Sequence, residues 1–241
     1  MRSSQDQELH IFTVSVNYLD ELEYITPYIL QRNFTTWTLI TSPEDKKTQE
    51  HINAIKKADY RIRQHITDKF YTHGVFNKAA GLNDALYSGP DPGENVWWLF
   101  LDSDIIVVND VPFDLLKKGY LHGAFRRLWT DFRKNASLPP VEEIPLEHGT
   151  VGIGFFCLVH SLDPRHTQCP PFKEHKYTTA ASYDMEYLLR WPEHLTCYLP
   201  VELIHLGMTC NRWMGELSWE NCRDERTSTF KIELFRRHFF Q

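Results

Sequence analysis

The stretch Val96-Trp97-Trp98-Leu99-Phe100-Leu101-Asp102-Ser103-Asp104 decides the fold, because a run of six apolar residues ends abruptly in two acids. Six successive apolar positions are typical of a strand that is buried on both faces, as the central strands of parallel sheets are. Ligands of open α/β sheets bind at the carboxyl ends of such strands. The sequence therefore predicts a buried central strand with a site at its end.

The residues before this strand indicate strands that alternate with helices. The expected strands are Ile11–Val16, Trp37–Thr41 and Tyr60–Ile66, and the expected helices run from about Asp20 to Arg32, from Ser42-Pro43-Glu44-Asp45 to about Lys57, and from Gly74 to Tyr87. At the second helix start, the Ser42 hydroxyl is expected to accept amide hydrogens. The alternation favours an α/β fold with a mostly parallel sheet flanked by helices.

The residues after the acidic step indicate fewer elements. We expect strands at Ile105–Val108, Phe155–Val159 and Val201–Ile204, and a helix over about Ala180–Arg190. The proline-containing stretch Arg133–Pro145 is predicted to be a long loop between two halves of the chain.

The composition bounds the class of protein. The chain has 241 residues, of which 42% are hydrophobic and 24% charged, as in a globular protein. A formal charge of -6 argues against broad capture of nucleic acid or of an anionic membrane. No apolar run approaches the roughly 20 residues of a membrane span, and the first residues lack the apolar segment of a signal peptide. We therefore expect a cytoplasmic protein whose five widely spaced cysteines are reduced thiols.

The two acids, Asp102 and Asp104, are the strongest chemical signal. The chain turns at a strand end, so both carboxylates can reach one divalent cation there. In isolation, Asp102-Ser103-Asp104 is equally typical of a solvated turn or a helix cap. Behind an apolar strand, two unpaired carboxylates are costly to bury, and a metal ion would compensate their charge.

The strand and its acids resemble the metal and nucleotide-sugar motif of glycosyltransferases with the GT-A fold, especially the inverting family 2. Three further segments follow that family's order: Asn77–Leu86, Ala181–Trp191, and Ile204–Gly207 with Asn211-Arg212-Trp213. The resemblance covers Ile11 to Trp213. It implies a single GT-A-like domain over residues 1–241, with a nucleotide-sugar-binding half at about 8–110 and an acceptor-side half at about 146–241.

The resemblance also implies a metal site that holds Mn²⁺ or Mg²⁺. In that family's pattern Asp104 would bind the metal directly, Asp102 would bind the metal or the ribose, and His205 would supply a third ligand. A divalent cation stabilises the charge that develops on a departing nucleotide diphosphate. An imidazole ligand shifts the preference towards manganese. The alternative for His205 is an ordinary core or surface histidine.

The resemblance further implies a catalytic base and a set of nucleotide contacts. Asp184 is the candidate base that takes the proton of an acceptor hydroxyl, and Glu186 is the second choice. Either acid is also explained as a first-turn residue stabilised by the helix dipole. The candidate nucleotide-binding residues are Asn17, Asp45, Lys78, Asp102, Arg212 and Trp213. Lys78 and Arg212 would pair with phosphate oxygens or remain solvated surface cations, and Asp45 is equally explained as part of a helix start.

The expected function is transfer of a sugar, with inversion, from a nucleotide-diphosphate donor, most simply a UDP-sugar, to an acceptor hydroxyl. A glycan, a lipid-linked glycan, a protein or a small molecule fits as acceptor, and the negative net charge makes a hydroxylated nucleic-acid base a poorer fit. A nucleotidyltransferase would use a similar acidic pair, but it favours a glycine-rich basic loop where this chain has Asn17–Glu21. A non-catalytic nucleotide-sugar-binding module is the other alternative.

Overall fold

The computed structural model describes residues 7–71, 76–130, 138–144, 156–167, 171–172, 174 and 187–206. These residues form an eight-stranded sheet with the strand order β3-β2-β1-β4-β7-β6-β8-β5. The strands are β1 Glu8–Val14, β2 Thr36–Thr41, β3 Ile62–Ile66, β4 Val96–Leu101, β5 Ile105–Val107, β6 Leu121–Thr130, β7 Phe156–His160 and β8 Thr196–Leu206. The α-helices are α1 Leu19–Ile29, α2 Lys46–Ala58 and α3 Lys78–Tyr87.

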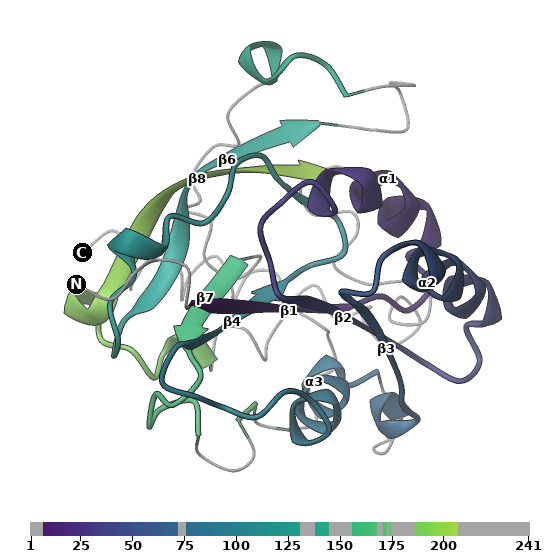
Figure 1. The fold of residues 1–241 in the computed structure, drawn as a ribbon, viewed down its shortest axis with the longest axis horizontal. Coiled ribbons are helices and arrows are strands. Elements are labelled where there is room, and N and C mark those ends of the chain that lie inside the picture. The colour runs from purple at the N-terminus through teal and green to yellow at the C-terminus, as the bar shows by residue number, and fades with distance from the viewer. Residues whose placement is uncertain are drawn as a thin grey trace, which may run out of the picture.

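The first four strands form the parallel part of the sheet. β1 pairs in parallel with β2 and with β4, and β2 pairs in parallel with β3. Figure 1 shows α1 and α2 on one face of these strands and α3 on the other. The carboxyl ends of β1 and β4 therefore lie side by side at one edge, as the sequence predicts for a ligand site.

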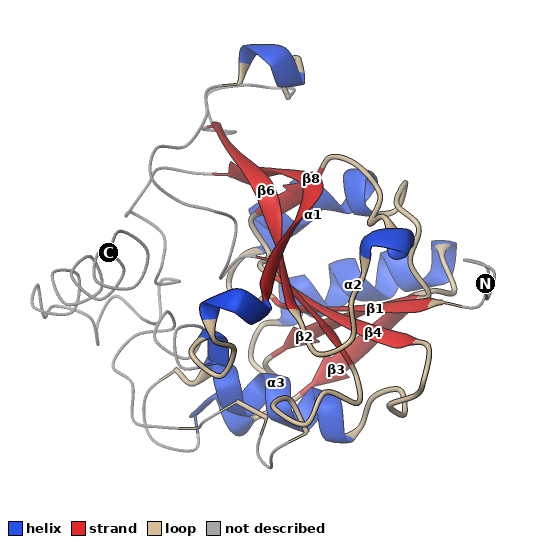
Figure 2. Cartoon of the chain, turned by 90° about the vertical axis from the view of Figure 1, so that its left-hand side faces the viewer, coloured by secondary structure: helices blue, strands red, loops and turns tan. Residues whose placement is uncertain are grey.

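The later strands extend the same sheet. β7 pairs antiparallel with β4 and with β6, and β8 pairs in parallel with β6 and antiparallel with β5. Figure 2 shows β6 and β8 curling away from the plane of β1 to β4. This curl brings the carboxyl-terminal part of β8 back to β5, directly after the acidic step.

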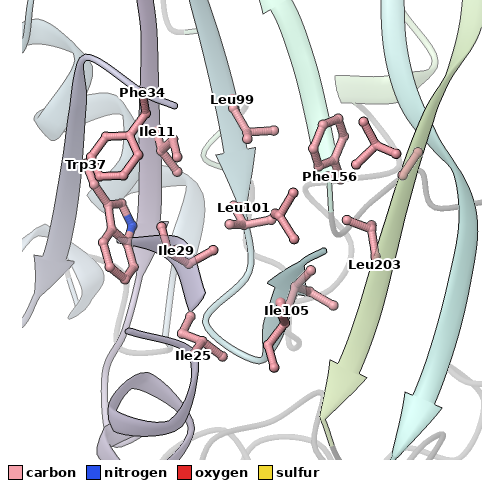
Figure 3. Packing of buried hydrophobic residues seen from close by; sticks show 14 of the residues in the cluster. Ile11, Ile25, Ile29, Phe34, Trp37, Leu99, Leu101, Ile105, Phe156 and Leu203 are labelled. Atoms are coloured by element: carbon pink, nitrogen blue, oxygen red, sulfur yellow. The ribbon is translucent and has the colours of Figure 1, made fainter. Parts of the chain in front are cut away.

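Hydrophobic clusters fill both faces of the sheet. All six residues of β4 are buried, which confirms the predicted central strand. Figure 3 shows Leu101, Ile105 and Leu203 in one cluster with residues of α1, and each of the three is at most 2% exposed. Burying one such side chain stabilises the fold by about 1.5–3 kcal/mol. The turn that carries the two acids is therefore held by well-packed residues on both sides.

Two predicted helix starts are corrected. α2 begins after Asp45, whose carboxylate accepts a hydrogen bond from the Thr48 amide at 3.2 Å, so Asp45 and not Ser42 is the cap. α3 begins at Lys78 and not at Gly74, because the Asn77 side chain caps it by accepting from the Ala80 amide at 3.1 Å. A capping side chain fixes the first turn more sharply than apolar periodicity does.

The second half differs more from the prediction. β6 was not expected, and β8 is longer than Val201–Ile204 at both ends. Part of the predicted loop Arg133–Pro145 is described, and it contains a short 3₁₀ turn at Val141–Glu143. Most of the predicted helix Ala180–Arg190 lies outside the described residues. The described residues contain no helix of the length and apolarity that crossing a bilayer requires.

Candidate functional site

The acidic step forms the turn between β4 and β5. The Ile105 amide donates to the Asp102 carbonyl at 3.3 Å, which closes the turn. The Leu206 amide donates to the Asp104 carbonyl at 2.8 Å, which joins the turn to the end of β8. Two main-chain hydrogen bonds therefore fix where the two carboxylates lie.

Asp104 and His205 face one another across this junction. His205 Nε2 lies 3.3 Å from Asp104 Oδ2, and Ile105 is the register partner of His205 in the β5–β8 pairing. Asp104 Oδ1 is buried and has no hydrogen-bond partner among the residues that the structure describes. A buried carboxylate oxygen without a partner is costly. A divalent cation there would satisfy it, since a carboxylate oxygen is a ligand that suits Mg²⁺ and Mn²⁺.

Asp102 is paired differently. Its Oδ1 atom forms an ion pair with Lys78 Nζ, and the side chains are 21% and 12% exposed respectively. Burial raises the pKa of the Asp102 carboxyl, and the Lys78 ammonium acts in the opposite direction. Lys78 is therefore not a solvated surface cation. It is the first residue of α3, and the Asn77 cap that fixes the start of this helix places Lys78 beside Asp102.

The three predicted metal ligands, Asp102, Asp104 and His205, lie at one edge of the sheet, but they do not form a complete set of metal ligands. Within the described ranges, no group of three or more His, Cys, Asp and Glu side chains is arranged to hold a metal ion. Asp102 is paired with Lys78, and Asp104 and His205 form a separate two-residue set. These two residues fit a metal, and Asp102 is held by a cation of the chain itself.

Asn17 and Asp45 contact one another at the ends of β1 and β2. The Asn17 amide donates to Asp45 Oδ2 at 2.7 Å, and Asn17 is exposed with a φ of 60°. A positive φ is uncommon outside glycine, although asparagine tolerates it better than most residues. Asp45 thus caps α2 and also holds the loop after β1. The helix-start interpretation of Asp45 is confirmed, and the nucleotide role of both residues stays a prediction.

Tyr18 is a candidate site residue that the sequence reasoning missed. Burial, followed by the charges of Asp104 and Asp102, raises the pKa of the Tyr18 hydroxyl well above its usual value. Tyr18 directly follows Asn17 at the end of β1, and β1 neighbours β4. Tyr18 could have been identified from the adjacency of the ends of β1 and β4. That adjacency can be used only when the strand order is known.

The remaining predicted site residues lie outside the described part of the chain. These are Asp184, Glu186, Arg212 and Trp213. The nearest described residue to the candidate base is Tyr187, three positions after Asp184, and it is 1% exposed. The roles of all four residues stay predictions.

Comparison with known proteins identifies solved structures that share the fold of this chain. No protein-family model and no curated protein matches this chain. A mannosyltransferase from Pyrobaculum calidifontis, solved with GDP-Man and Mn²⁺, matches 85% of this chain and 58% of its own with a TM-score of 0.54 and 9% identity. GalNAc-T7, solved with UDP, GalNAc and Mn²⁺, matches 84% of this chain and 44% of its own with a TM-score of 0.52 and 10% identity.

A third solved structure matches over nearly the full length of both chains. The galactosyltransferase LgtC, in complex with donor and acceptor sugar analogues, covers 93% of this chain and 95% of its own, with a TM-score of 0.44 and 11% identity. The predicted α/β class, a GT-A-like mostly parallel sheet flanked by helices, is confirmed. The chain spans only about half the length of the two matches with the higher TM-scores.

Proposed function

We propose that this protein is a metal-dependent glycosyltransferase that moves a sugar from a nucleotide-diphosphate donor, a UDP-sugar in the first instance, to an acceptor hydroxyl with inversion. The observation that carries the proposal is the buried Asp104 Oδ1 atom beside His205 at the end of β4, which has no hydrogen-bond partner within the described part of the chain. The GT-A-like fold supports it, because this edge is where ligands of such sheets bind.

Asp104 and His205 would hold the cation, and Mn²⁺ or Mg²⁺ would supply charge stabilisation for the departing diphosphate. Lys78 neutralises Asp102, so that the turn does not present two uncompensated carboxylates to an anionic donor. The Lys78 ammonium also places a positive charge where diphosphate oxygens would approach. The chain's own side chains thus set the local charge of the donor site.

The acceptor hydroxyl needs a base, and we propose Asp184 for this role with Glu186 as the alternative. Inversion follows when the base and the leaving group act on opposite faces of the anomeric carbon. Asn17, Asp45 and Tyr18 would contact the nucleoside, since they lie at neighbouring strand ends. Arg212 and Trp213 complete the proposed donor contacts.

The acceptor is proposed only by class. A glycan, a lipid-linked glycan, a protein or a small molecule with a free hydroxyl fits the chemistry, and a hydroxylated nucleic-acid base fits the negative chain less well. The solved matches include a complex with GDP-Man and one with UDP, so both nucleotide types belong in the first screen.

A donor screen tests the proposal. The melting temperature is measured with UDP-, GDP- and dTDP-sugars in the presence of Mn²⁺. Released nucleotide is then measured for each donor that stabilises the protein, with a panel of hydroxyl acceptors of the proposed classes present to receive the sugar. A donor at 100 times its dissociation constant adds about 2.7 kcal/mol to the free energy of unfolding. Stabilisation by one donor class with sugar transfer supports the proposal. Stabilisation without any release of nucleotide would indicate the binding module, and release of pyrophosphate from a triphosphate would indicate a nucleotidyltransferase.

A further inference from the structure

A buried amide joins α3 to a segment that lies far along the chain. Asn83 is 1% exposed, on the apolar face of α3. Its Nδ2 atom donates to the Phe172 carbonyl at 2.7 Å, and its Oδ1 atom accepts from the Phe172 amide at 2.9 Å. Nδ2 also donates to Glu174 Oε1 at 2.8 Å. One side chain therefore satisfies both main-chain polar groups of Phe172.

This pairing selects one register of the segment around Phe172. An apolar residue at position 83 would pack in any of several registers, whereas an amide that needs both a donor and an acceptor fits one main-chain position. Burying Asn83 without these partners would be costly. The hydrogen bonds therefore specify which residue sits against α3, in addition to stabilising the contact.

The Phe172 ring packs against Tyr187 and against Phe100 of β4. The Phe172 and Tyr187 rings are stacked, with centroids 4.4 Å apart and an interplanar angle of 28°. The Phe172 ring meets the Phe100 ring edge-on at 4.9 Å. Phe100 lies two positions before Asp102, at the end of the strand that carries the acidic step. The rings thus connect the segment to the donor side of the site.

His166 fixes the other end of Tyr187. Its Nδ1 atom lies 2.7 Å from the Tyr187 hydroxyl, in a contact that is buried. Burial lowers the pKa of His166 to about 3, so the imidazole is neutral near pH 7. Tyr187 is consequently held through both its ring face and its hydroxyl.

We propose that Asn83, Phe172, Tyr187 and His166 form a positioning network that sets where Tyr187 lies relative to the end of β4. The proposal rests on the proposed function, in which Asp184, three positions before Tyr187, is the base. α3 carries both Lys78 at its start and Asn83 further along, so one helix holds the cation beside Asp102 and the main chain of Phe172 together.

The test compares Asn83→Leu with Asn109→Leu. Asn109 is a matched control, because its Nδ2 atom donates to the Pro200 carbonyl at 2.8 Å and its Oδ1 atom accepts from the Glu202 amide at 2.9 Å. Three quantities are measured on the whole chain: the dissociation constant for UDP with Mn²⁺, the kcat and acceptor KM of sugar transfer, and amide hydrogen exchange over residues 187–191. Those residues contain the hydrogen bond from the Arg190 amide to the Tyr187 carbonyl.

We expect Asn83→Leu to lower kcat at least tenfold and to speed exchange over residues 187–191 at least tenfold, while the UDP dissociation constant changes less than threefold. Misplacement of a catalytic group by about 1 Å can cost on the order of a hundredfold in rate. Asn109→Leu should change none of these by more than threefold. Equal changes in both variants, or unchanged kcat and exchange in Asn83→Leu, overturn the network.

Tyr187→Phe is the second variant, for the case that Asn83→Leu does not fold. It keeps the stacked rings and removes only the hydroxyl that meets His166, and Tyr60→Phe at an exposed position is its control. We expect kcat at least threefold lower with unchanged UDP binding, and a kcat equal to that of the parent overturns the proposal. Failure of the unaltered protein to bind any of the screened nucleotides or to transfer sugar contradicts the proposed function instead. The exchange data then still report whether Asn83 holds residues 187–191.

Discussion

The Asp104 carboxylate lies 3.3 Å from His205 Nε2, although the two residues come from opposite halves of the chain. The contact is fixed by the main chain, because Ile105 pairs with His205 in the β5–β8 ladder and Leu206 donates to the Asp104 carbonyl. The remaining groups of the site are arranged around this contact.

Replacing Lys78 with methionine should destabilise the fold, because Asp102 then keeps a largely buried charge without its partner. Breaking a buried pair on one side costs about 3–5 kcal/mol, and the partial exposure here places the expected loss at the lower end. The double variant Lys78→Met/Asp102→Asn should recover part of the lost stability. Urea unfolding measures the free energy of unfolding of the single and the double variant, with Lys118→Met as control.

Lys118 pairs with Glu94 at 2.8 Å, but the two side chains are 53% and 74% exposed. An exposed pair contributes about 0–1 kcal/mol. Equal losses in Lys78→Met and Lys118→Met would contradict the buried character of the Asp102 pair.

Gly81 is a position where α3 packs tightly against the Phe70 ring. A Cβ atom at Gly81 would overlap the Phe70 ring, so Gly81→Ala should destabilise the protein despite the gain of about 1 kcal/mol in helix propensity. Overpacking typically costs about 1–3 kcal/mol. Urea unfolding of Gly81→Ala and of Gly81→Ala/Phe70→Leu checks this, since the smaller side chain should relieve the overlap. A stabilised Gly81→Ala would show that the helix does not pack this closely.

Acid should weaken the fold through His122. The ring is buried, its Nε2 atom accepts from the Lys117 amide at 3.0 Å, and burial lowers its pKa to about 4. In the unfolded state the His122 ring binds a proton as the pH falls below about 6.5, whereas in the folded state the ring stays neutral down to about pH 4. The contribution of His122 to the free energy of unfolding is therefore complete above about pH 6.5 and is lost as the pH falls towards 4. Between pH 7 and pH 5 the loss from this one group is about 2 kcal/mol.

Urea unfolding at pH 7 and pH 5 measures this dependence. His122→Gln should show a smaller decrease between the two pH values than the parent protein, whereas His194→Gln, at an exposed position, should keep the parent's decrease. An identical pH dependence in His122→Gln and the parent would mean that His122 is not buried in its neutral form.

Asp184→Asn separates binding from catalysis. The amide cannot accept the acceptor's proton, so we expect transfer at least a hundredfold slower with UDP binding within threefold of the parent. Glu186→Gln measured alongside decides between the two candidate bases. Full transfer rates in Asp184→Asn would remove it from the mechanism.

The sequence predicted the parts of the fold that local patterns determine. The six apolar residues of β4 predicted a strand buried on both faces, and the acids after it predicted a site at the edge of the sheet. β6 was missed because Gly123, Arg126 and Arg127 break any alternation, and the strand exists through its long pairing with β8. Pairing between distant strands leaves no local signal.

The same limit applies to the site. The prediction left Lys78 as either a phosphate ligand or a solvated cation, and only the path of α3 shows that it reaches Asp102. The partners of Asn83 lie about ninety residues further along the chain, so its buried amide resembled an ordinary residue of an amphipathic helix. Tyr18 needed the adjacency of β1 and β4.

The most direct test of the central claim is calorimetry of UDP binding with Mn²⁺ and then in EDTA, on the parent protein, on Asp104→Ala and on the surface control Asp91→Ala. We predict heat of binding only with Mn²⁺ in the parent and in Asp91→Ala, and none under either condition in Asp104→Ala. Equal affinity for UDP with Mn²⁺ and with EDTA in the parent protein would contradict a metal role for Asp104 and His205.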